Sequence, residues 1–230
     1  VAAFNYFRGW IGLYHDTNAS NYSEPSMGWK WVEPIAYNNN PFSSIKVELL
    51  RNNTLQQTYS QNLSYENQIA PFSFDINITA ELAKYRIKIH TVYNGSEELV
   101  KDIDDIVAGD VFVIQGQSNA AAVKYNGSAN GYQSDYIRVY SGGNISSSGL
   151  LSNDSWYYGQ GDGNENSSGN TGQWGLVLAK KLVDEFNIPI AIFNGAHGGQ
   201  PISFFQAPTD YTSSTNTNYG RLYYRLTKNG

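Results

Sequence analysis

Hydrophobic residues alternate with polar residues along much of the segment 45–107. The alternation is clearest at 45–49, 72–78 and 85–89, where apolar residues take every second position. A period of two places successive side chains on opposite faces of a strand, so these stretches predict half-buried antiparallel strands. Turn-forming residues separate them, and the pair Asn94-Gly95 predicts a hairpin.

Several short strands at this spacing predict an all-β domain, which we place at residues 1–108. We expect an immunoglobulin-like β-sandwich, because such sandwiches are built from short strands separated by turns at regular intervals. The first part, residues 1–44, is rich in aromatic side chains but weakly periodic. We expect it to supply the remaining strands of the sandwich and a long loop.

The pattern changes at residue 109, where continuous apolar runs replace the alternation. Residues 111–114 are apolar at every position, which is typical of a parallel strand covered on both faces. A second run of this kind occupies residues 190–193. Strand, crossover helix and strand form the unit of an α/β sheet, so residues 109–230 predict an α/β domain.

An amphipathic helix is predicted between these two strands. Thr171 is a candidate N-cap, and Asn187 and Pro189 mark the end of the helical pattern. Apolar residues recur at helical spacing, and we expect them to face the core. They are Trp174, Val177, Leu178, Leu182 and Phe186.

A long loop is predicted before this helix. Residues 141–171 are rich in Gly, Ser and Asn and contain one group of three aromatic side chains, Trp156, Tyr157 and Tyr158. These aromatic residues either fold over a cleft and stack on a sugar ring or anchor the loop in a local cluster.

The composition of the 230 residues narrows the classes of function. There is no cysteine, which excludes disulfides and a cysteine nucleophile. With 15 basic and 20 acidic residues the net charge is −5 and no basic cluster is seen, so we expect no nucleic-acid partner. The apolar runs are much shorter than the roughly 18 residues of a membrane span, so we expect none. The bias toward Asn, Ser, Gly and Tyr suits hydrogen bonding to and stacking on sugars.

No leader peptide is visible at the start of the sequence. Val1 is followed neither by a basic segment nor by an uninterrupted apolar stretch. We expect a targeting peptide to have been removed or left out, and the protein to be secreted, periplasmic or on the cell surface, with a bacterial source favoured.

Chemically distinctive residues follow both predicted parallel strands. The first strand leads into 115–120, which contains Ser118, and the second leads into 194–202, which contains the pair Gly198-Gly199. The carboxyl ends of parallel strands share one edge of the sheet, where α/β proteins place their sites. A serine on a tight strand-to-helix turn suits a nucleophile, and backbone N–H groups at a glycine pair suit an oxyanion hole. The residues alone favour an ordinary pair of turns over a catalytic site, since glycine pairs are common in turns.

The two segments resemble the SGNH hydrolases, in the branch of sialate O-acetylesterase and acetylxylan esterases. The resemblance is carried by residues 109–120, which read GDVFVIQGQSNA, and by residues 194–202, which read NGAHGGQPI. It implies that residues 109–230 form an incomplete three-layer, flavodoxin-like α/β domain. It also implies a serine esterase that removes O-acetyl groups from carbohydrates through an acyl-serine intermediate, with no cofactor and no metal.

The resemblance assigns roles to individual residues of this sequence. Ser118 is the expected nucleophile, and its own N–H and those of Gly198 and Gly199 are the expected oxyanion donors. Asn119 is expected to stabilise the turn at Ser118. The residues expected to contact the acetylated carbohydrate are Gln117, Asn119, His197, Gln200, Trp156 and Tyr157.

Two parts of the branch's pattern are not found in this sequence. These are a later block that contains Gln-Gly-Glu or Asn, and the Asp-x-x-His motif that supplies the catalytic base. We therefore expect residues 109–230 to be the N-terminal part of the domain, completed by a C-terminal segment or a second chain.

The three histidines of the sequence are weak candidates for the missing base. His15 and His90 fall in the expected sandwich, and His197 precedes the glycine pair, where a substrate contact or structural role is favoured over catalysis. The alternative function is a non-catalytic carbohydrate-binding or surface-adhesion module that keeps an SGNH-like fold.

Overall fold

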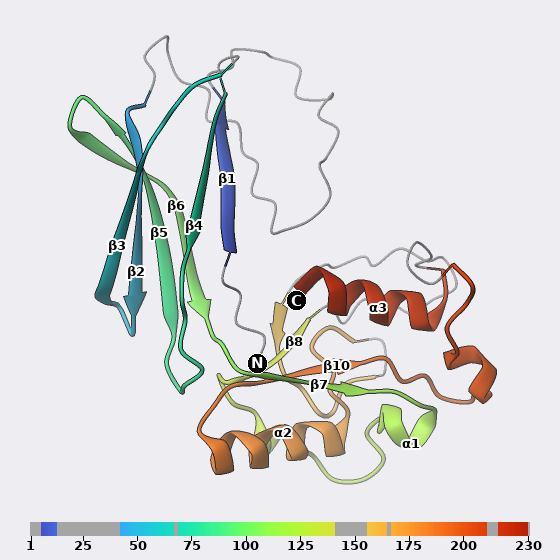
Figure 1. The fold of residues 1–230 in the computed structure, drawn as a ribbon. Coiled ribbons are helices and arrows are strands. Elements are labelled where there is room, and N and C mark those ends of the chain that lie inside the picture. The colour runs from blue at the N-terminus through green and yellow to red at the C-terminus, as the bar shows by residue number, and fades with distance from the viewer. Residues whose placement is uncertain are drawn as a thin grey trace. The chain divides into compact units, whose positions relative to one another are not determined.

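The computed structural model shows a mixed α/β protein with three sheets and few helices (Figure 1). The chain divides into two compact units. One comprises Phe4–Ile78 and Ala83–Ile106, and the other is built from Val107–Gly230 together with Thr79–Leu82. The structure describes residues 6–12, 42–66, 69–140, 156–164, 167–210 and 216–229.

The first unit is built from antiparallel strands, as the alternating pattern predicts. Its four-stranded sheet has the order β3-β2-β5-β6, and a second sheet pairs β1 with β4. Asn94 and Gly95, with φ of 49° and 79°, form the predicted hairpin between β5 and β6. The strands are β1 (Tyr6–Gly12), β2 (Ser44–Arg51), β3 (Thr54–Asn62), β4 (Ile69–Asp75), β5 (Tyr85–Tyr93) and β6 (Ser96–Ile106).

Alternate residues of these strands form the core of the first unit. Along β2 and β5 every second side chain is buried, including Ile45, Val47 and Ile89. Phe72 and Phe74 of β4 join the same cluster. The immunoglobulin-like topology stays a prediction, and most of residues 1–44 lies outside the described part of the chain.

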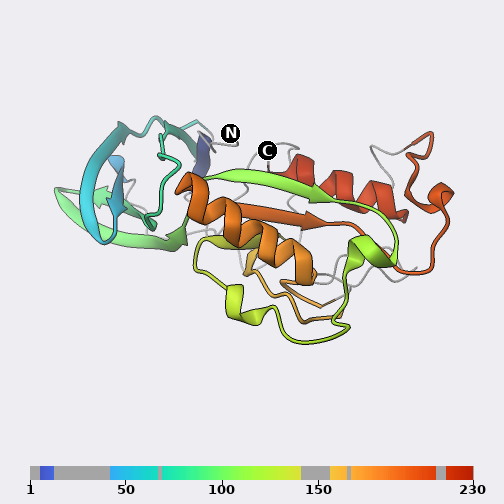
Figure 2. The same cartoon turned by 90° about the horizontal axis from the view of Figure 1, so that it is seen from below.

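The second unit contains a four-stranded sheet with the order β7-β10-β8-β9 (Figure 2). Strand β10 is parallel to both β7 and β8, and β9 is antiparallel to β8. The strands are β7 (Asp110–Ile114), β8 (Ile137–Tyr140), β9 (Trp156–Tyr158) and β10 (Ile190–Asn194). The helices are α1 (Ser118–Ala121), α2 (Gln173–Phe186) and α3 (Asn218–Asn229), with short 3-10 turns η1 (Asn130–Tyr132) and η2 (Ile202–Phe205).

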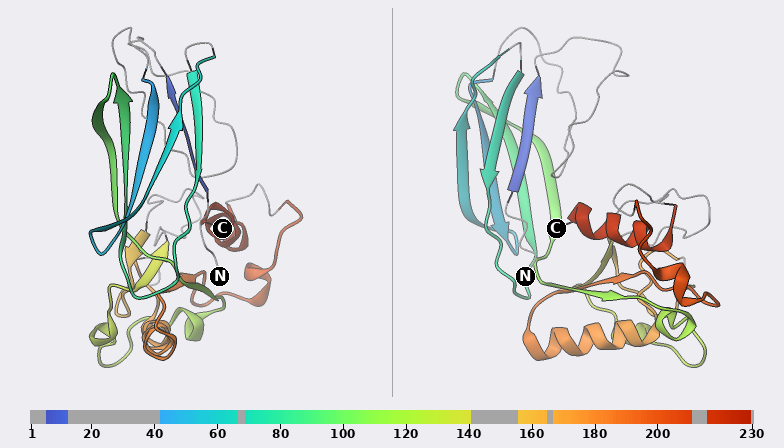
Figure 3. Two further views of the ribbon diagram at one scale, coloured as in Figure 1. Left: turned by 60° about the vertical axis from the view of Figure 1, so that its left-hand side comes forward. Right: turned by 45° about the vertical axis from the view of Figure 1, so that its right-hand side comes forward.

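Helices α2 and α3 lie on opposite faces of this sheet, as the right-hand view of Figure 3 shows. Ile190 and Ile192 of β10 share a core cluster with α2. Phe193, which points to the other face, packs with Leu222 of α3. Among the described helices, none is long and apolar enough to span a membrane.

The face of α2 that packs on the sheet agrees with the predicted one only in part. Val177 and Leu182 pack against the core as predicted. Trp174, Leu178 and Phe186 are exposed. The buried residues are Gly175, Leu176, Ala179 and Val183. Small residues set the face because they let the helix approach the strands closely: a Cβ on Gly175 would lie 2.9 Å from Cδ1 of Ile114. The helix also begins one residue later than predicted, with Gly172 as N-cap, while its end at Asn187 is as predicted.

Strand β7 also departs from the prediction. Val111, Phe112 and Val113 are 38%, 36% and 47% exposed, so the strand is not covered on both faces in this structure. The physical reason is its place at the end of the sheet, where only one neighbour, β10, is paired with it among the described strands.

The segment predicted as a long loop contains a strand. Trp156–Tyr158 forms β9, which pairs with β8. The ring of Trp156 makes edge-on contacts with Tyr140 at 5.2 Å and with Phe193 at 5.8 Å between centroids. For Trp156 these are the contacts of a local anchor, the second of the two predicted roles. The role of Tyr157 stays a prediction.

Candidate active site

Ser118 lies on a tight turn directly after β7, at the first residue of α1. The turn depends on Gly116, whose φ of 145° is rarely adopted by other residues and whose added Cβ would lie 3.0 Å from that of Ala120. Gln117 is the N-cap, and its carbonyl accepts the N–H groups of Ala120 and Ala121 at 2.8 and 2.9 Å. The strand-to-helix turn predicted at the serine is therefore present, with Ser118 exposed.

The segment that follows β10 runs beside this turn. The N–H of Gly195 donates to the carbonyl of Ile114 at 2.8 Å, and that of His197 donates to the carbonyl of Gly116 at 2.9 Å. These two bonds continue the β7–β10 pairing beyond the ends of both strands. The sequence separates these segments by about eighty residues, and the sheet brings them together as the α/β pattern predicts.

Two backbone N–H groups in these segments are available to a ligand. Within the described part of the chain, neither Ser118 nor Gly199 donates a backbone hydrogen bond. Gly199 adopts a left-handed φ of 73°, and an added Cβ would meet nothing within 4 Å. Gly198, the other predicted donor, is half-buried next to it.

The hydroxyl of Ser118 is bonded to an amide rather than to a base. Its Oγ donates to Oε1 of Gln117 at 2.8 Å. No histidine among the described residues is hydrogen-bonded to it. The ring of His197 packs against Phe204, with 5.4 Å between centroids, and His90 contacts Glu48 in the other unit at 3.4 Å. His15 lies outside the described residues.

The remaining predicted contacts are divided between two places. Gln117 and Asn119 are exposed beside Ser118, and Gln200 is half-buried after the glycine pair. Trp156 and Tyr157 lie in β9, at the opposite edge of the sheet from β7. The structure thus brings the first three residues to the carboxyl ends of β7 and β10, and places the aromatic pair in β9, which β10 and β8 separate from β7.

Asn218 joins the two segments and was not singled out from the sequence. It is 2% exposed at the start of α3. Its Oδ1 accepts a hydrogen bond from Nε2 of Gln115 at 2.8 Å, and its Nδ2 donates to the carbonyl of Gly195 at 2.7 Å. One amide therefore ties the end of β7 to the end of β10 across 103 residues of sequence.

Trp174 is a second residue whose place the sequence did not reveal. Its indole Nε1 donates to the carbonyl of Asn119 at 2.8 Å, while 43% of the residue stays exposed. The helical pattern suggested a core side chain, because spacing alone cannot tell which of two adjacent stripes of a helix faces the sheet.

Helix α3 places two arginines beneath the end of β10. Both Arg221 and Arg225 are buried, and the two terminal nitrogens of Arg225 donate to the carbonyl of Asn194 at 3.2 Å. Burial and the charge of Arg221 lower the pKa of Arg225 to about 10, and burial lowers the pKa of Arg221. The guanidinium of Arg225 thus supports the backbone from which the predicted oxyanion segment starts.

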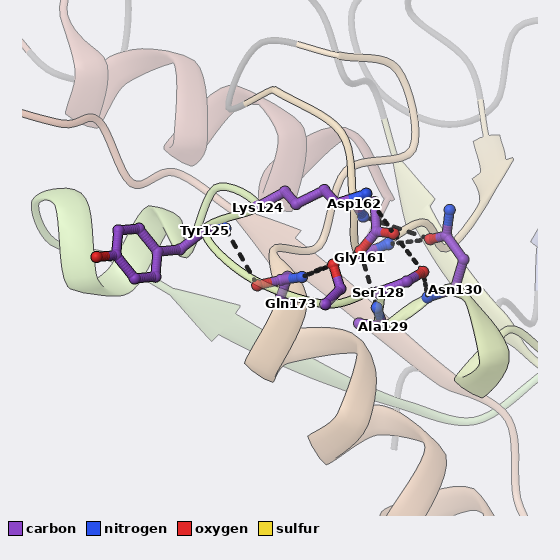
Figure 4. A network of polar contacts seen from close by, with 9 residues as sticks. Lys124, Tyr125, Ser128, Ala129, Asn130, Gly161, Asp162 and Gln173 are labelled. Carbon is purple, nitrogen blue, oxygen red and sulfur yellow. Dashed lines mark hydrogen bonds and ion pairs between the residues drawn. The ribbon is translucent and has the colours of Figure 1, made fainter.

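A polar network around Asp162 joins the connection between α1 and β8 to the segment after β9 and to the first residue of α2 (Figure 4). The carboxylate accepts hydrogen bonds from the Ser128 hydroxyl, from the N–H of Ala129 at 2.8 Å and from Nε2 of Gln173 at 3.2 Å. These bonds lower the pKa of Asp162 to about 2. In the part of the chain that the structure describes, no group of three or more His, Cys, Asp or Glu side chains is arranged to hold a metal ion.

Comparison with known proteins gives matches among solved structures. No protein family matches the sequence. No curated protein matches it either. A solved structure described as a carbohydrate acetylesterase from Xanthomonas citri aligns with 82% of this chain and 42% of its own, at 17% identity and a TM-score of 0.41. The chain thus spans less than half the length of that protein.

Proposed function

We propose that the second unit is the N-terminal part of an SGNH-type serine esterase that removes O-acetyl groups from carbohydrates. The observation that carries this proposal is the pairing of two segments at one sheet edge. Ser118 is exposed on a strand-to-helix turn, and the segment with the free N–H of Gly199 is bonded alongside it. A nucleophile and oxyanion donors need this combination.

The chemistry proceeds in two balanced steps. The Oγ of Ser118 bonds to the acetyl carbonyl carbon, the bond from that carbon to the sugar oxygen breaks, and the sugar leaves with a proton. Water then hydrolyses the acetyl-serine ester, which releases acetate and restores the hydroxyl. The N–H groups of Ser118 and Gly199, with that of Gly198, stabilise the oxyanion in both steps.

Proton transfer requires a base that the described residues do not place at Ser118. In this proposal the base comes from a C-terminal segment or a second chain, and the Ser118 hydroxyl turns from Gln117 toward it. Loss of a triad histidine costs several powers of ten in rate and leaves a small residual activity. We therefore expect residues 1–230 alone to be a very poor esterase.

Gln117, Asn119, His197 and Gln200 are the proposed contacts to the sugar. Each of the four lies next to the proposed nucleophile or to a proposed oxyanion donor in sequence, and all four lie at the carboxyl ends of β7 and β10. Trp156 is left out of this set, because its ring packs against Tyr140 and Phe193.

Labelling with a fluorophosphonate, followed by intact mass, tests the proposal. We expect one label on the longer natural polypeptide that contains this sequence, and none on its Ser118→Ala variant. Ser128→Ala is the matched control, because Ser128 is another exposed serine whose hydroxyl is engaged elsewhere, with Asp162. Absence of Ser118 labelling in the longer polypeptide would contradict the esterase proposal.

The second candidate is a glycan-binding module without catalysis. It is favoured by one specific observation, the bond from the Ser118 hydroxyl to Gln117 in place of a base. Calorimetric titration with acetylated and deacetylated xylan oligosaccharides separates the two functions. A binding module binds the oligosaccharides, leaves the acetylated one chemically unchanged over hours and shows no Ser118 labelling. The esterase converts the acetylated oligosaccharide into the deacetylated one.

A further inference from the structure

Two exposed aromatic side chains lie near the turn at Ser118, and the proposed mechanism uses neither of them. They are Tyr125, in the segment after α1, and Trp174, in the first turn of α2. Tyr125 is 97% exposed and Trp174 is 43% exposed. A single exposed apolar side chain is ordinary, whereas several that gather at one place indicate a binding surface.

Trp174 is held beside the turn that carries Ser118. Its Nε1 donates to the carbonyl of Asn119 at 2.8 Å, and Asn119 directly follows Ser118. Across so few bonds the indole lies within roughly 10 Å of Ser118. The hydrogen bond engages the edge of the ring, and much of the residue stays exposed. The ring is therefore oriented by the protein and open to a ligand.

The segment of Tyr125 is bonded to the residue before Trp174. The backbone N–H of Tyr125 donates to Oε1 of Gln173 at 3.4 Å. The N–H of Gln173 donates to the carbonyl of Ala122 at 3.0 Å, which joins the start of α2 to the end of α1. Figure 4 shows the side chain of Tyr125 pointing away from the network around Asp162. The main chain of Tyr125 is thus fixed at the start of α2 while its ring extends into solvent.

The three segments that form this surface and the neighbouring glycine pair carry little charge. Residues 115–128, 171–178 and 194–206 contain one lysine, Lys124, with no arginine and no acidic residue. The Nζ of Lys124 lies 3.7 Å from the carboxylate of Asp162. Arginine is the residue best suited to pair with the carboxylate of an acidic sugar. Aromatic faces and side-chain amides instead suit neutral sugar rings, which offer apolar faces and hydroxyl groups.

We propose that Trp174 and Tyr125 form an aromatic platform on which a neutral sugar chain stacks, so that the acetylated ring at Ser118 is one unit of an oligosaccharide or polysaccharide. This inference rests on the proposed function, which identifies the ligand as a carbohydrate. An acidic monosaccharide such as an acetylated sialic acid would leave the platform without a ring to bind.

Calorimetric titration of residues 1–230 with acetylated oligosaccharides of xylan and of mannan tests the proposal. We expect the wild type to bind at least one of them more tightly than acetylated sialic acid. Tyr125→Ala and Trp174→Ala are each expected to weaken that binding by about threefold to tenfold, because each removes one stacking ring.

Variants that keep a ring separate stacking from structure. Trp174→Phe loses the bond to Asn119, and Tyr125→Phe loses only a hydroxyl. Both are expected to keep oligosaccharide binding within about twofold of the wild type, because both keep an aromatic face. Tyr125→Ala keeps the test decisive if Trp174→Ala fails to fold, since a side chain that is 97% exposed adds little to stability.

Phe186→Ala is the matched control on the same helix. Phe186 is 61% exposed and ends α2, roughly 18 Å along the helix axis from Trp174. The start of α2 lies beside α1, and its end lies at the far side of the unit (Figures 1 and 2). We expect Phe186→Ala to bind the oligosaccharides as the wild type does.

Three results would overturn the platform: no binding of either oligosaccharide by the wild type, equal binding by Tyr125→Ala and Phe186→Ala, or a dimer mass by light scattering that Tyr125→Ala abolishes. The last would mean that a second copy covers the rings. Fluorophosphonate labelling of Ser118 is read separately and involves no sugar. Labelling together with ring-independent binding removes the platform alone, whereas ring-dependent binding without labelling supports the platform and removes the esterase.

Discussion

At the scale of single residues, backbone conformation determines where the proposed oxyanion donors point. Gly199 has a φ of 73°, in the left-handed region that other residues adopt at a cost of roughly 1 kcal/mol. No atom lies within 4 Å of an added Cβ, so substitution there tests conformation without a steric clash. Gly95 in the β5–β6 hairpin has the same two properties, with a φ of 79°.

Gly199→Ala and Gly95→Ala are therefore a matched pair. Each variant is expected to lose about 1 kcal/mol of unfolding free energy, measured by urea titration. Only Gly199→Ala is expected to slow fluorophosphonate labelling of Ser118 in the longer polypeptide, by about tenfold, because it turns a proposed oxyanion donor. An equal labelling rate in the two variants would remove Gly199 from the proposed site.

At the scale of elements, the buried side-chain amide of Asn218, at the start of α3, joins the segments that follow β7 and β10. Removing the Asn218 side chain leaves the Gly195 carbonyl and the Gln115 amide without the partners that they have here. A buried polar group that loses its partner costs about 1–3 kcal/mol. Asn218→Ala is expected to lower the unfolding free energy by that amount and to slow labelling of Ser118, since both site segments are released.

Thr227→Ala is the control on the same helix. Thr227 is exposed, and its hydroxyl bonds only to carbonyls of its own helix. Its loss is expected to change stability by no more than about 0.5 kcal/mol. Urea unfolding of both variants, with labelling of each, gives the comparison; equal stability of the two would show that the Asn218 bonds contribute nothing.

Local pattern predicted some elements well and others poorly, for physical reasons. The strands at 45–49 and 85–89 and the turn at Ser118 follow from alternation and from glycine, which act over a few residues. The packing face of α2 does not, because Gly175 and Ala179 decide it through their small size rather than their hydrophobicity. Hydrophobic patterns underweight such residues.

The residues of the candidate site divide in the same way, into those whose place follows from neighbouring residues and those whose place depends on partners distant in the sequence. The positions of Ser118 and Gly199 after two neighbouring strands were predictable, because each residue lies in a distinctive local sequence after an apolar strand. Asn218 and Trp174 were not, since each acquires its place through a partner far away in the sequence. No local signal distinguishes a bridging asparagine from an ordinary helix start.

At the scale of the whole molecule, pH acts on the second unit through Asp162. Its pKa of about 2 lies below that of an unfolded aspartate, because the folded chain donates hydrogen bonds to the carboxylate. A lowered pKa contributes stability above the unfolded value of about 4, and this contribution disappears as the pH falls toward 2. Asp162 therefore stabilises the loops at neutral pH and ceases to do so in acid.

Asp162→Asn is expected to unfold at a lower urea concentration than the wild type at pH 7. The difference between the two proteins should shrink steadily between pH 4 and pH 2, as the wild type loses its own carboxylate. Asp184→Asn, which removes a carboxylate bonded to Lys180 on the exposed side of α2, controls for the change of net charge. Urea titrations followed by tryptophan fluorescence at four pH values supply the comparison. A gap between wild type and Asp162→Asn that stays constant across this range would mean that the network holds the loops through geometry alone, without the charge of Asp162.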